Sequence, residues 1–159
     1  MRELLYLPDL LAGITLEAGP NGLRAIRFGQ RMMEDSPGPI VIAAEQQLRE
    51  YMAGERAVFD LPLDPTGTPF QLEVWAALAQ IPYGVTSSYR DIAIAVRRPK
   101  GFQAIGQANT RNPLPVIVPC HRVINADGSM GGYGGGLDRK RQLLDLERTY
   151  AQRFGKTAA

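Results

Sequence analysis

Cysteine and histidine are almost absent from this sequence of 159 residues, which contains one of each, Cys120 and His121. A single thiol cannot form an intrachain disulfide, and the usual structural zinc sites need four cysteine or histidine ligands from the chain. The sequence therefore excludes a disulfide framework and a structural zinc site, and we expect no metal. A lone thiol also fits a reducing compartment.

Long apolar runs are absent as well. No run reaches the ~18 residues that a membrane-spanning helix needs, and the charged start Met1-Arg2-Glu3 lacks the apolar region of a signal peptide. The composition, with 45% hydrophobic and 21% charged residues, is ordinary for a folded protein. We expect a globular protein in the cytoplasm with no membrane partner.

Positive charge is concentrated in the second part of the chain. The net charge is +2, but residues 1–68 contain 6 basic and 10 acidic side chains, whereas residues 69–159 contain 12 and 6. A basic half can mark a surface that binds a polyanion such as a nucleic acid. The alternative is a chance scatter of surface charge, and charge alone favours that alternative.

Proline and glycine interrupt the chain at residues 61–69, which we interpret as a linker. We predict an α+β fold in which a small N-terminal module, residues 1–66, precedes a mainly helical C-terminal domain, residues 67–159. In the module, the residue pattern predicts a β-hairpin formed by residues 11–17 and 23–28. A helix over residues 40–52 and a further short strand over residues 57–63 follow.

The C-terminal domain carries four predicted helices. The first starts at Pro69, and the other three run over residues 89–96, 102–110 and 137–150. The second and third flank a turn rich in proline and glycine, and the third has small side chains, which is compatible with a helix-turn-helix. Without further context an ordinary pair of antiparallel helices is the preferred interpretation.

The only thiol lies in the sequence Pro119-Cys120-His121-Arg122, beside two basic residues. A lone cysteine is most often an inert apolar residue. An electropositive setting, however, can lower the pKa of a thiol and favour the nucleophilic thiolate. The glycine-rich segment 131–136 suits a loop whose backbone approaches a ligand closely, or alternatively a flexible surface loop.

A carboxylate in the last predicted helix lies on its apolar face. Glu147 is four residues after Leu143 and three after Leu144, and a buried carboxylate needs a partner. His121 is one candidate, because a carboxylate that orients an imidazole beside a cysteine follows the logic of a catalytic triad. A helix-surface pairing of Glu147 with Arg148 or Lys140 is the alternative, and the residues alone do not decide between the two.

The run Pro119-Cys120-His121-Arg122-Val123 resembles the active-site signature of the O6-alkylguanine-DNA alkyltransferases, the methylated-DNA–protein-cysteine methyltransferases. The resemblance is specific over residues 67–148 and weaker over residues 1–66. It extends to Gly67-Thr68-Pro69-Phe70-Gln71, Val74-Trp75, Ile81-Pro82-Tyr83-Gly84, Ser88-Tyr89, Ala104-Ile105-Gly106, Asn112-Pro113 and Gly132-Tyr133-Gly134-Gly135-Gly136.

The resemblance implies DNA repair by irreversible, stoichiometric transfer of an alkyl group from O6-alkylguanine to Cys120, without a cofactor. His121 would take the thiol proton through a water molecule, Glu147 would complete the relay, and Asn112 would brace the active-site turn. Tyr89 would contact the extruded base and assist protonation of the departing guanine. Activity on O4-alkylthymine stays open.

The resemblance also implies how the substrate is recognised. The carbonyls of Cys120 and Val123 would accept from the exocyclic amine of guanine, the Gly134 N–H would bind its O6, and Tyr133 would wall the pocket. The partner would be double-stranded DNA, bound in the minor groove by a protein that is monomeric in solution and associated with the nucleoid if bacterial. The expected DNA-binding residues are Phe102, Gln103, Ala104, Gly106, Arg111 and Arg122.

One position departs from the family pattern. Many members have an arginine that enters the base stack where this chain has Gln103, which can form hydrogen bonds but carries no charge.

Two other functions compete with alkyl transfer. A non-catalytic sensor of alkylated DNA would lack the acceptor cysteine, which is present here, and a cysteine hydrolase normally takes its histidine from a distant segment.

Overall fold

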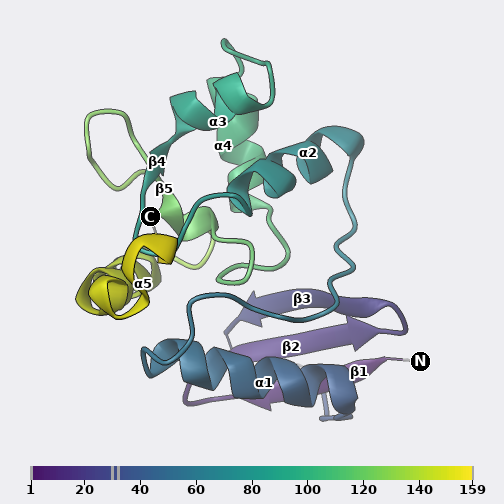
Figure 1. Cartoon of the computed structure of the whole chain (residues 1–159). Helices are drawn as coiled ribbons and strands as arrows, with labels where there is room; N and C mark the ends of the chain where they lie inside the picture. Colours follow the sequence, from purple (N-terminus) through teal and green to yellow (C-terminus); the bar gives the residue numbers. More distant parts are fainter. Residues whose placement is uncertain (1, 30, 32, 159) are drawn as a thin grey trace. The chain divides into compact units, whose positions relative to one another are not determined.

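The computed structural model describes residues 2–29, 31 and 33–158. It divides into two compact units, Met1–Thr66 and Gly67–Ala159. Figure 1 shows a sheet with one helix in the first unit, and helices joined by long loops in the second. None of the helices in the described residues has the length and apolar character to cross a lipid bilayer.

The first unit is built on a three-stranded antiparallel sheet in the order β1-β2-β3. The strands are β1 (Glu3–Leu7), β2 (Ile14–Gly19) and β3 (Gly22–Phe28). The last two form the predicted hairpin, and its tight turn brings Gly19 opposite Gly22. The hairpin is therefore as the turn residues indicate, with a third strand added on one side.

Helix α1 (Pro39–Met52) packs on this sheet and contacts all three strands, as Figure 1 shows. The Glu3 carboxylate accepts hydrogen bonds from the backbone N–H groups of Ile40 and Val41, at 2.9 and 3.0 Å. It thereby caps a helix whose own N-cap residue has no side chain to do so. The buried residues of the helix are Val41, Ala44, Leu48 and Tyr51.

Two parts of the first unit differ from the sequence prediction. The sequence pattern does not indicate β1, because its leucines do not alternate regularly with polar residues. Residues 57–63, predicted as a strand, make only an isolated bridge, in which Leu23 donates to Pro62 and accepts from Asp64, both at 2.8 Å. Proline has no N–H to extend such a ladder, so the segment stays a loop.

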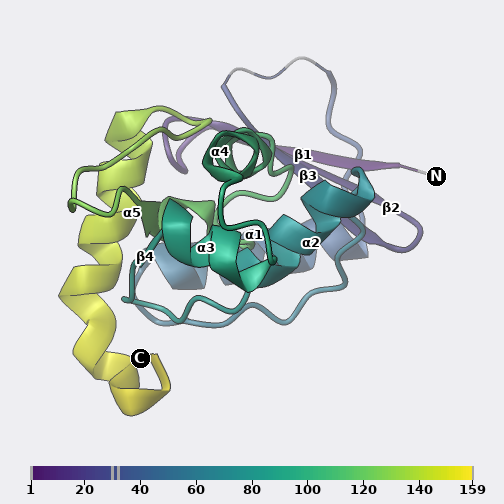
Figure 2. The same ribbon diagram turned by 90° about the horizontal axis from the view of Figure 1, so that it is seen from above.

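The second unit contains four α-helices within the described residues, and all four coincide with predicted helices. In Figure 2, α2, α3 and α4 lie next to one another and α5 lies at the edge of this group. The α+β fold class is confirmed. The helices are α2 (Pro69–Leu78), α3 (Tyr89–Ala95), α4 (Phe102–Thr110) and α5 (Leu137–Tyr150), followed by the 3-10 segment Ala151–Ala158.

Side chains fix where α2 and α3 begin. Thr68 and Gln71 exchange hydrogen bonds with each other's backbone at 3.1 and 3.0 Å, which is a capping box, and Ser88 and Asp91 form a second one. The indole N–H of Trp75 donates to the carbonyl of Ala108 at 2.9 Å and so links α2 to α4. The three helices thus form a framework with defined ends.

A short parallel pairing connects this framework to the segment around Cys120. Strand β4 (Ser87–Ser88) pairs with β5 (Val123–Ile124), and a 3-10 turn at Cys120–Arg122 leads directly into β5. Tyr89 follows β4 directly, and a charge on Cys120 raises the pKa of Tyr89, so the two residues lie near each other.

Replacing Thr68 tests the capping box. Thr68→Ala leaves the backbone N–H of Gln71 without its side-chain partner, and we expect the free energy of unfolding to fall by about 1 kcal/mol. Urea unfolding followed by far-UV circular dichroism measures this change. Thr86→Ala, at an exposed loop position, is the matched control, and an equal loss in both variants would contradict the capping role.

Candidate active site

Cys120 lies in a buried turn that is braced from both sides. Its side chain and backbone are 4% exposed, and its N–H donates to the carbonyl of Val118 at 2.8 Å. The Asn112 amide donates to the same carbonyl at 2.8 Å and accepts from the Leu114 N–H at 3.0 Å, while Asn109 donates to the Cys120 carbonyl at 3.4 Å. Asn112 therefore bonds to the backbone at two points of the segment that leads into this turn.

The environment of the thiol favours its protonated form. Burial raises the pKa of Cys120 to about 11, although a hydrogen bond from Asn112 and the charge of Lys140 oppose the rise. The net direction is opposite to the sequence expectation, because burial outweighs the contributions that lower this pKa, among them a backbone hydrogen bond from His121. A base is consequently needed to generate the thiolate at neutral pH.

His121 is positioned to be that base. Its ring is completely buried, and Nε2 lies 2.7 Å from Oε2 of Glu147. Burial lowers the pKa of His121, with the Glu147 hydrogen bond opposing the effect, so the ring is neutral at pH 7. Since a carboxylate can only accept, Nε2 carries the hydrogen and Nδ1, which has no hydrogen-bond partner in the described part of the protein, is free to accept a proton.

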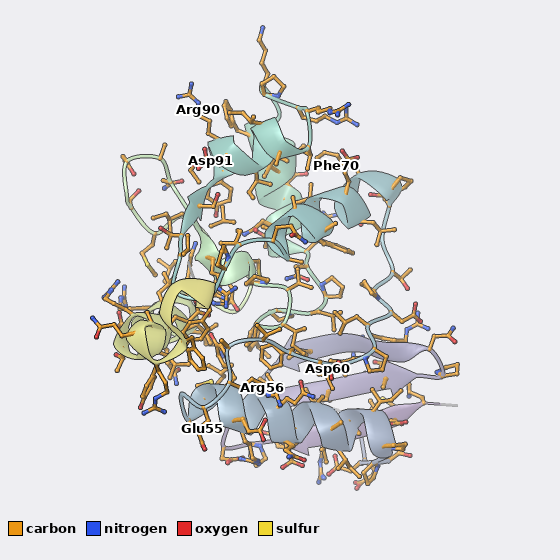
Figure 3. All side chains as sticks on the ribbon, viewed as in Figure 1. Glu55, Arg56, Asp60, Phe70, Arg90 and Asp91 are labelled. Atoms are coloured by element: carbon orange, nitrogen blue, oxygen red, sulfur yellow. The ribbon has the colours of Figure 1, made fainter. Side chains whose placement is uncertain are left out.

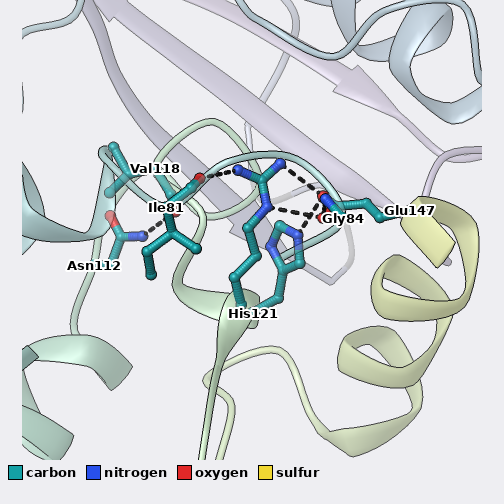
Figure 4. Close-up of polar contacts among 7 residues, drawn as sticks. Ile81, Gly84, Asn112, Val118, His121 and Glu147 are labelled. Carbon is teal, nitrogen blue, oxygen red and sulfur yellow. Dashed lines mark hydrogen bonds and ion pairs between the residues drawn. The ribbon is translucent and has the colours of Figure 1, made fainter. Parts of the chain in front are cut away.

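Glu147 is held by Arg122 as well as by His121. The guanidinium donates to both carboxylate oxygens at 2.8 Å and to the Ile81 carbonyl at 2.6 Å, while the Gly84 N–H also donates to the carboxylate at 3.1 Å. Figure 4 shows these contacts converging from three segments of the chain. Burial alone would raise the pKa of Glu147, but the hydrogen bonds and charges of His121 and Arg122 hold it below its ordinary value.

These contacts decide between the two partners that the sequence allows for Glu147. Arg148 pairs with Asp145 at 3.1 Å instead, and Lys140 contacts other groups.

The contacts of Arg122 correct the expectation that this residue binds DNA. Arg122 is 6% exposed and its guanidinium is occupied within the fold, so it cannot reach a phosphate from this position.

Lys140 is a site residue that the sequence analysis does not identify. It is fully buried, and its ammonium group donates to the carbonyls of Val123 at 2.7 Å, of Gly132 at 3.0 Å and of Met130. Burial lowers its pKa to about 8, so it remains mostly charged at neutral pH. Lys140 lies seven residues before Glu147 and therefore on the same helix face, and this spacing could have indicated that Lys140 is buried.

Lys140 also bears on a predicted substrate contact. The Val123 carbonyl, expected to accept from the exocyclic amine of guanine, already accepts from this ammonium group. A carbonyl oxygen has a second lone pair, so it can accept another hydrogen bond.

The other residues expected at the substrate lie around the same turn. The Tyr89 hydroxyl donates to the Gly132 carbonyl at 3.4 Å, and Tyr133 is 9% exposed. Burial, together with nearby Cys120, raises the pKa of both tyrosines. Gly134 lies against the end of α4, because a Cβ atom there would be 2.9 Å from the Thr110 carbonyl.

A groove of about 840 Å³ opens beside these residues. Its walls are the start of α3, one face of α4 and the loops at residues 125–126 and 132. Among the predicted DNA-binding residues, Phe102, Gln103, Gly106 and Arg111 line it, whereas Ala104 is exposed on α4 without lining it. Arg90 lines it too and projects away from α3 in Figure 3.

No group of three or more histidine, cysteine, aspartate or glutamate side chains is arranged to hold a metal ion among the residues that the structure describes.

Comparison with known proteins agrees with this geometry. The sequence model described as "6-O-methylguanine DNA methyltransferase, DNA binding domain" matches residues 69–149. The chain belongs to this methyltransferase family. The constitutive methylated-DNA–protein-cysteine methyltransferase of Bacillus subtilis is 53% identical over 116 residues, which are 72% of this chain and 70% of the relative. The Mycobacterium tuberculosis methyltransferase is 54% identical over 108 residues, 68% of this chain and 66% of the relative.

Solved methyltransferases have the same fold. A crystal structure of the O6-methylguanine methyltransferase of M. tuberculosis matches with a TM-score of 0.84 and 42% identity, and the match covers 94% of each chain. A crystal structure of the M. tuberculosis protein in complex with DNA matches with a TM-score of 0.82 and 43% identity, over 94% of this chain and 93% of the other.

The buried site predicts how stability depends on pH. The pKa of His121, the only histidine, lies below 6.5 in the folded protein, so the unfolded state takes up a proton first as the pH falls. The folded state therefore loses stability as the pH falls through 6.5, and the lowered pKa of Glu147 extends the loss below 4.5. Between pH 7.5 and 5.5 we expect a loss of about 1 kcal/mol.

Urea unfolding at both pH values measures this loss, and His121→Gln is the comparison because it removes the titrating ring. The variant should show little change between the two pH values, whatever its absolute stability. The same slope in both proteins would mean that the pKa of His121 is not lowered by folding.

Proposed function

We propose that this methyltransferase repairs duplex DNA by moving the alkyl group of O6-alkylguanine onto Cys120, once per molecule. The observation that carries the proposal is the buried Cys120 turn. It contains a neutral histidine held by a carboxylate, and Cys120 lies near Tyr89, which lines the groove. Membership of the methyltransferase family supports the same reaction.

The proposed reaction is a displacement at the alkyl carbon. His121 takes the Cys120 proton at Nδ1, through a water molecule, and the thiolate sulfur attacks the carbon attached to O6. The S–C bond forms as the C–O6 bond breaks, and the electron pair remains on guanine, which takes up a proton. The products are S-alkylcysteine and normal guanine. The carbon keeps its oxidation state, so the step as written consumes no electron carrier.

Residues around the turn would recognise and activate the leaving base. Tyr89 assists protonation of the departing guanine, and Tyr133 forms the wall of the base pocket. The Gly134 N–H binds O6, and the carbonyls of Cys120 and Val123 accept from the exocyclic amine. Both tyrosines have raised pKa values, so their hydroxyl groups remain protonated.

The groove would be the DNA site. A base inside a duplex cannot reach a buried sulfur, so the alkylated nucleotide must leave the stack. α4 enters the minor groove with Phe102, Gln103 and Gly106 toward the DNA, while Arg111 contacts phosphate. Because phosphate contacts carry no sequence information, they suit damage that occurs in any sequence. We infer that a monomer acts on chromosomal DNA in the cytoplasm, at the nucleoid in a bacterium.

Intact and peptide mass spectrometry test the transfer. After incubation with duplex DNA containing O6-methylguanine, we expect one added methyl group on the Cys120 peptide, equal in amount to the guanine restored. Cys120→Ser, which replaces sulfur by oxygen at the same position, should restore none. Binding without a mass change would instead indicate a sensor, and several guanines restored per molecule would contradict a single-turnover reaction.

Gln103→Arg tests the assignment of this uncharged side chain to the DNA. One added charge at a phosphate-rich surface should strengthen duplex binding at low salt and steepen the slope of log affinity against log salt by about 0.9. Fluorescence anisotropy at several salt concentrations measures the slope, and alkyl transfer should persist at a changed rate. Gln80→Arg, exposed and outside the groove lining, is the matched control. No change in affinity or in rate would remove Gln103 from the interface.

A further inference from the structure

Phe102 is an aromatic side chain left exposed at the groove. It is the first residue of α4, and it is 48% exposed. A single exposed apolar residue needs no explanation by itself. Among the large apolar residues that are exposed in the described ranges of the chain, however, Phe102 is the one that is aromatic and the one that lines the groove.

The backbone beneath Phe102 is firmly supported. The Ile105 N–H donates to the Gly101 carbonyl at 2.9 Å, and the Gly101 N–H donates to the Arg98 carbonyl at 2.8 Å. The opposite face of α4 is buried through Ile105, Ala108 and Asn109. The exposed ring thus projects from a rigid element, and such an element can push into a ligand without itself yielding.

The surroundings of Phe102 suit a duplex. One turn further along α4, a Cβ atom at Gly106 would meet nothing within 4 Å, so DNA can approach the helix closely. Arg90 and Arg111 line the same groove, and Arg98 and Lys100 are exposed just before α4. Cations around the groove can bind phosphates, which would hold the stacked bases against the ring.

We propose that Phe102 is a wedge that enters the base stack of duplex DNA next to the alkylated guanine. The inference rests on the proposed function, because it concerns how the base leaves the duplex. Apolar side chains inserted between base steps unstack them and lower the cost of distorting the duplex. Phe102 fills the space that the extruded base leaves, and the neighbouring Gln103 forms hydrogen bonds with the base that has lost its partner.

Transfer rates on two substrates test the wedge. The substrates are a duplex with O6-methylguanine opposite cytosine and the lesion-bearing single strand alone, in which no base pair has to be opened. For Phe102→Ala we expect the ratio of the duplex rate to the single-strand rate to fall about tenfold or more, since unstacking dominates only in the duplex. Phe102→Leu, which keeps an apolar side chain, should recover part of the ratio. Ile94→Ala is the control, because Ile94 is 56% exposed but does not line the groove.

A second readout detects insertion directly. In a Cys120→Ser background, 2-aminopurine placed beside the lesion should become more fluorescent on binding when Phe102 is present and stay stacked with Phe102→Ala. An unchanged rate ratio, or equal loss on both substrates, would overturn the wedge while leaving alkyl transfer intact. Absence of transfer from either substrate by the unmodified protein would instead refute the proposed function itself.

Discussion

The site depends on one buried carboxylate. Glu147 receives hydrogen bonds from His121, Arg122 and the backbone of Gly84, and it thereby joins α5 to the Cys120 turn and to the loop before β4. A carboxylate buried without such partners would be very costly, so the three contacts and the folding of this region depend on each other. Because burial and, to a lesser extent, the charge of Arg122 lower the pKa of His121, the carboxylate can orient the ring while the ring stays neutral.

In this arrangement one feature, burial, keeps the Cys120 thiol protonated, and a different group, His121, is placed to remove its proton. Burial keeps Cys120 protonated at rest and therefore weakly reactive toward other electrophiles. His121 stays neutral at pH 7, so under the proposed mechanism it is ready to take the proton when a substrate is bound. A reagent that is consumed by its own reaction gains from such control, since an unproductive reaction of the single cysteine would inactivate the protein permanently.

The sequence predicts those parts of the fold that depend on local residues. Thr68 indicates the start of α2, and residues 86–88 offer three possible caps for α3, of which Ser88 is the one used. The spacing of Leu143 and Glu147 places a carboxylate on the apolar helix face, where it is buried. The sequence does not predict contacts between segments that are distant in sequence. The partners of Arg122 are Ile81 and Glu147, which no local pattern connects to it, so its basic side chain suggests a DNA contact that the fold does not allow. Lys140 was missed for a similar reason, because its partners are backbone carbonyls.

The most direct measurement is of the proton on His121. Labelling with 15N-histidine gives signals from one imidazole only, because the chain contains a single histidine. At pH 7 the nitrogen spectrum should show a neutral ring with the hydrogen on Nε2, assigned through its couplings to the ring protons, and Nδ1 without a hydrogen. An imidazolium, or a neutral ring with the hydrogen on Nδ1, would contradict the account, since neither could accept the Cys120 proton at Nδ1.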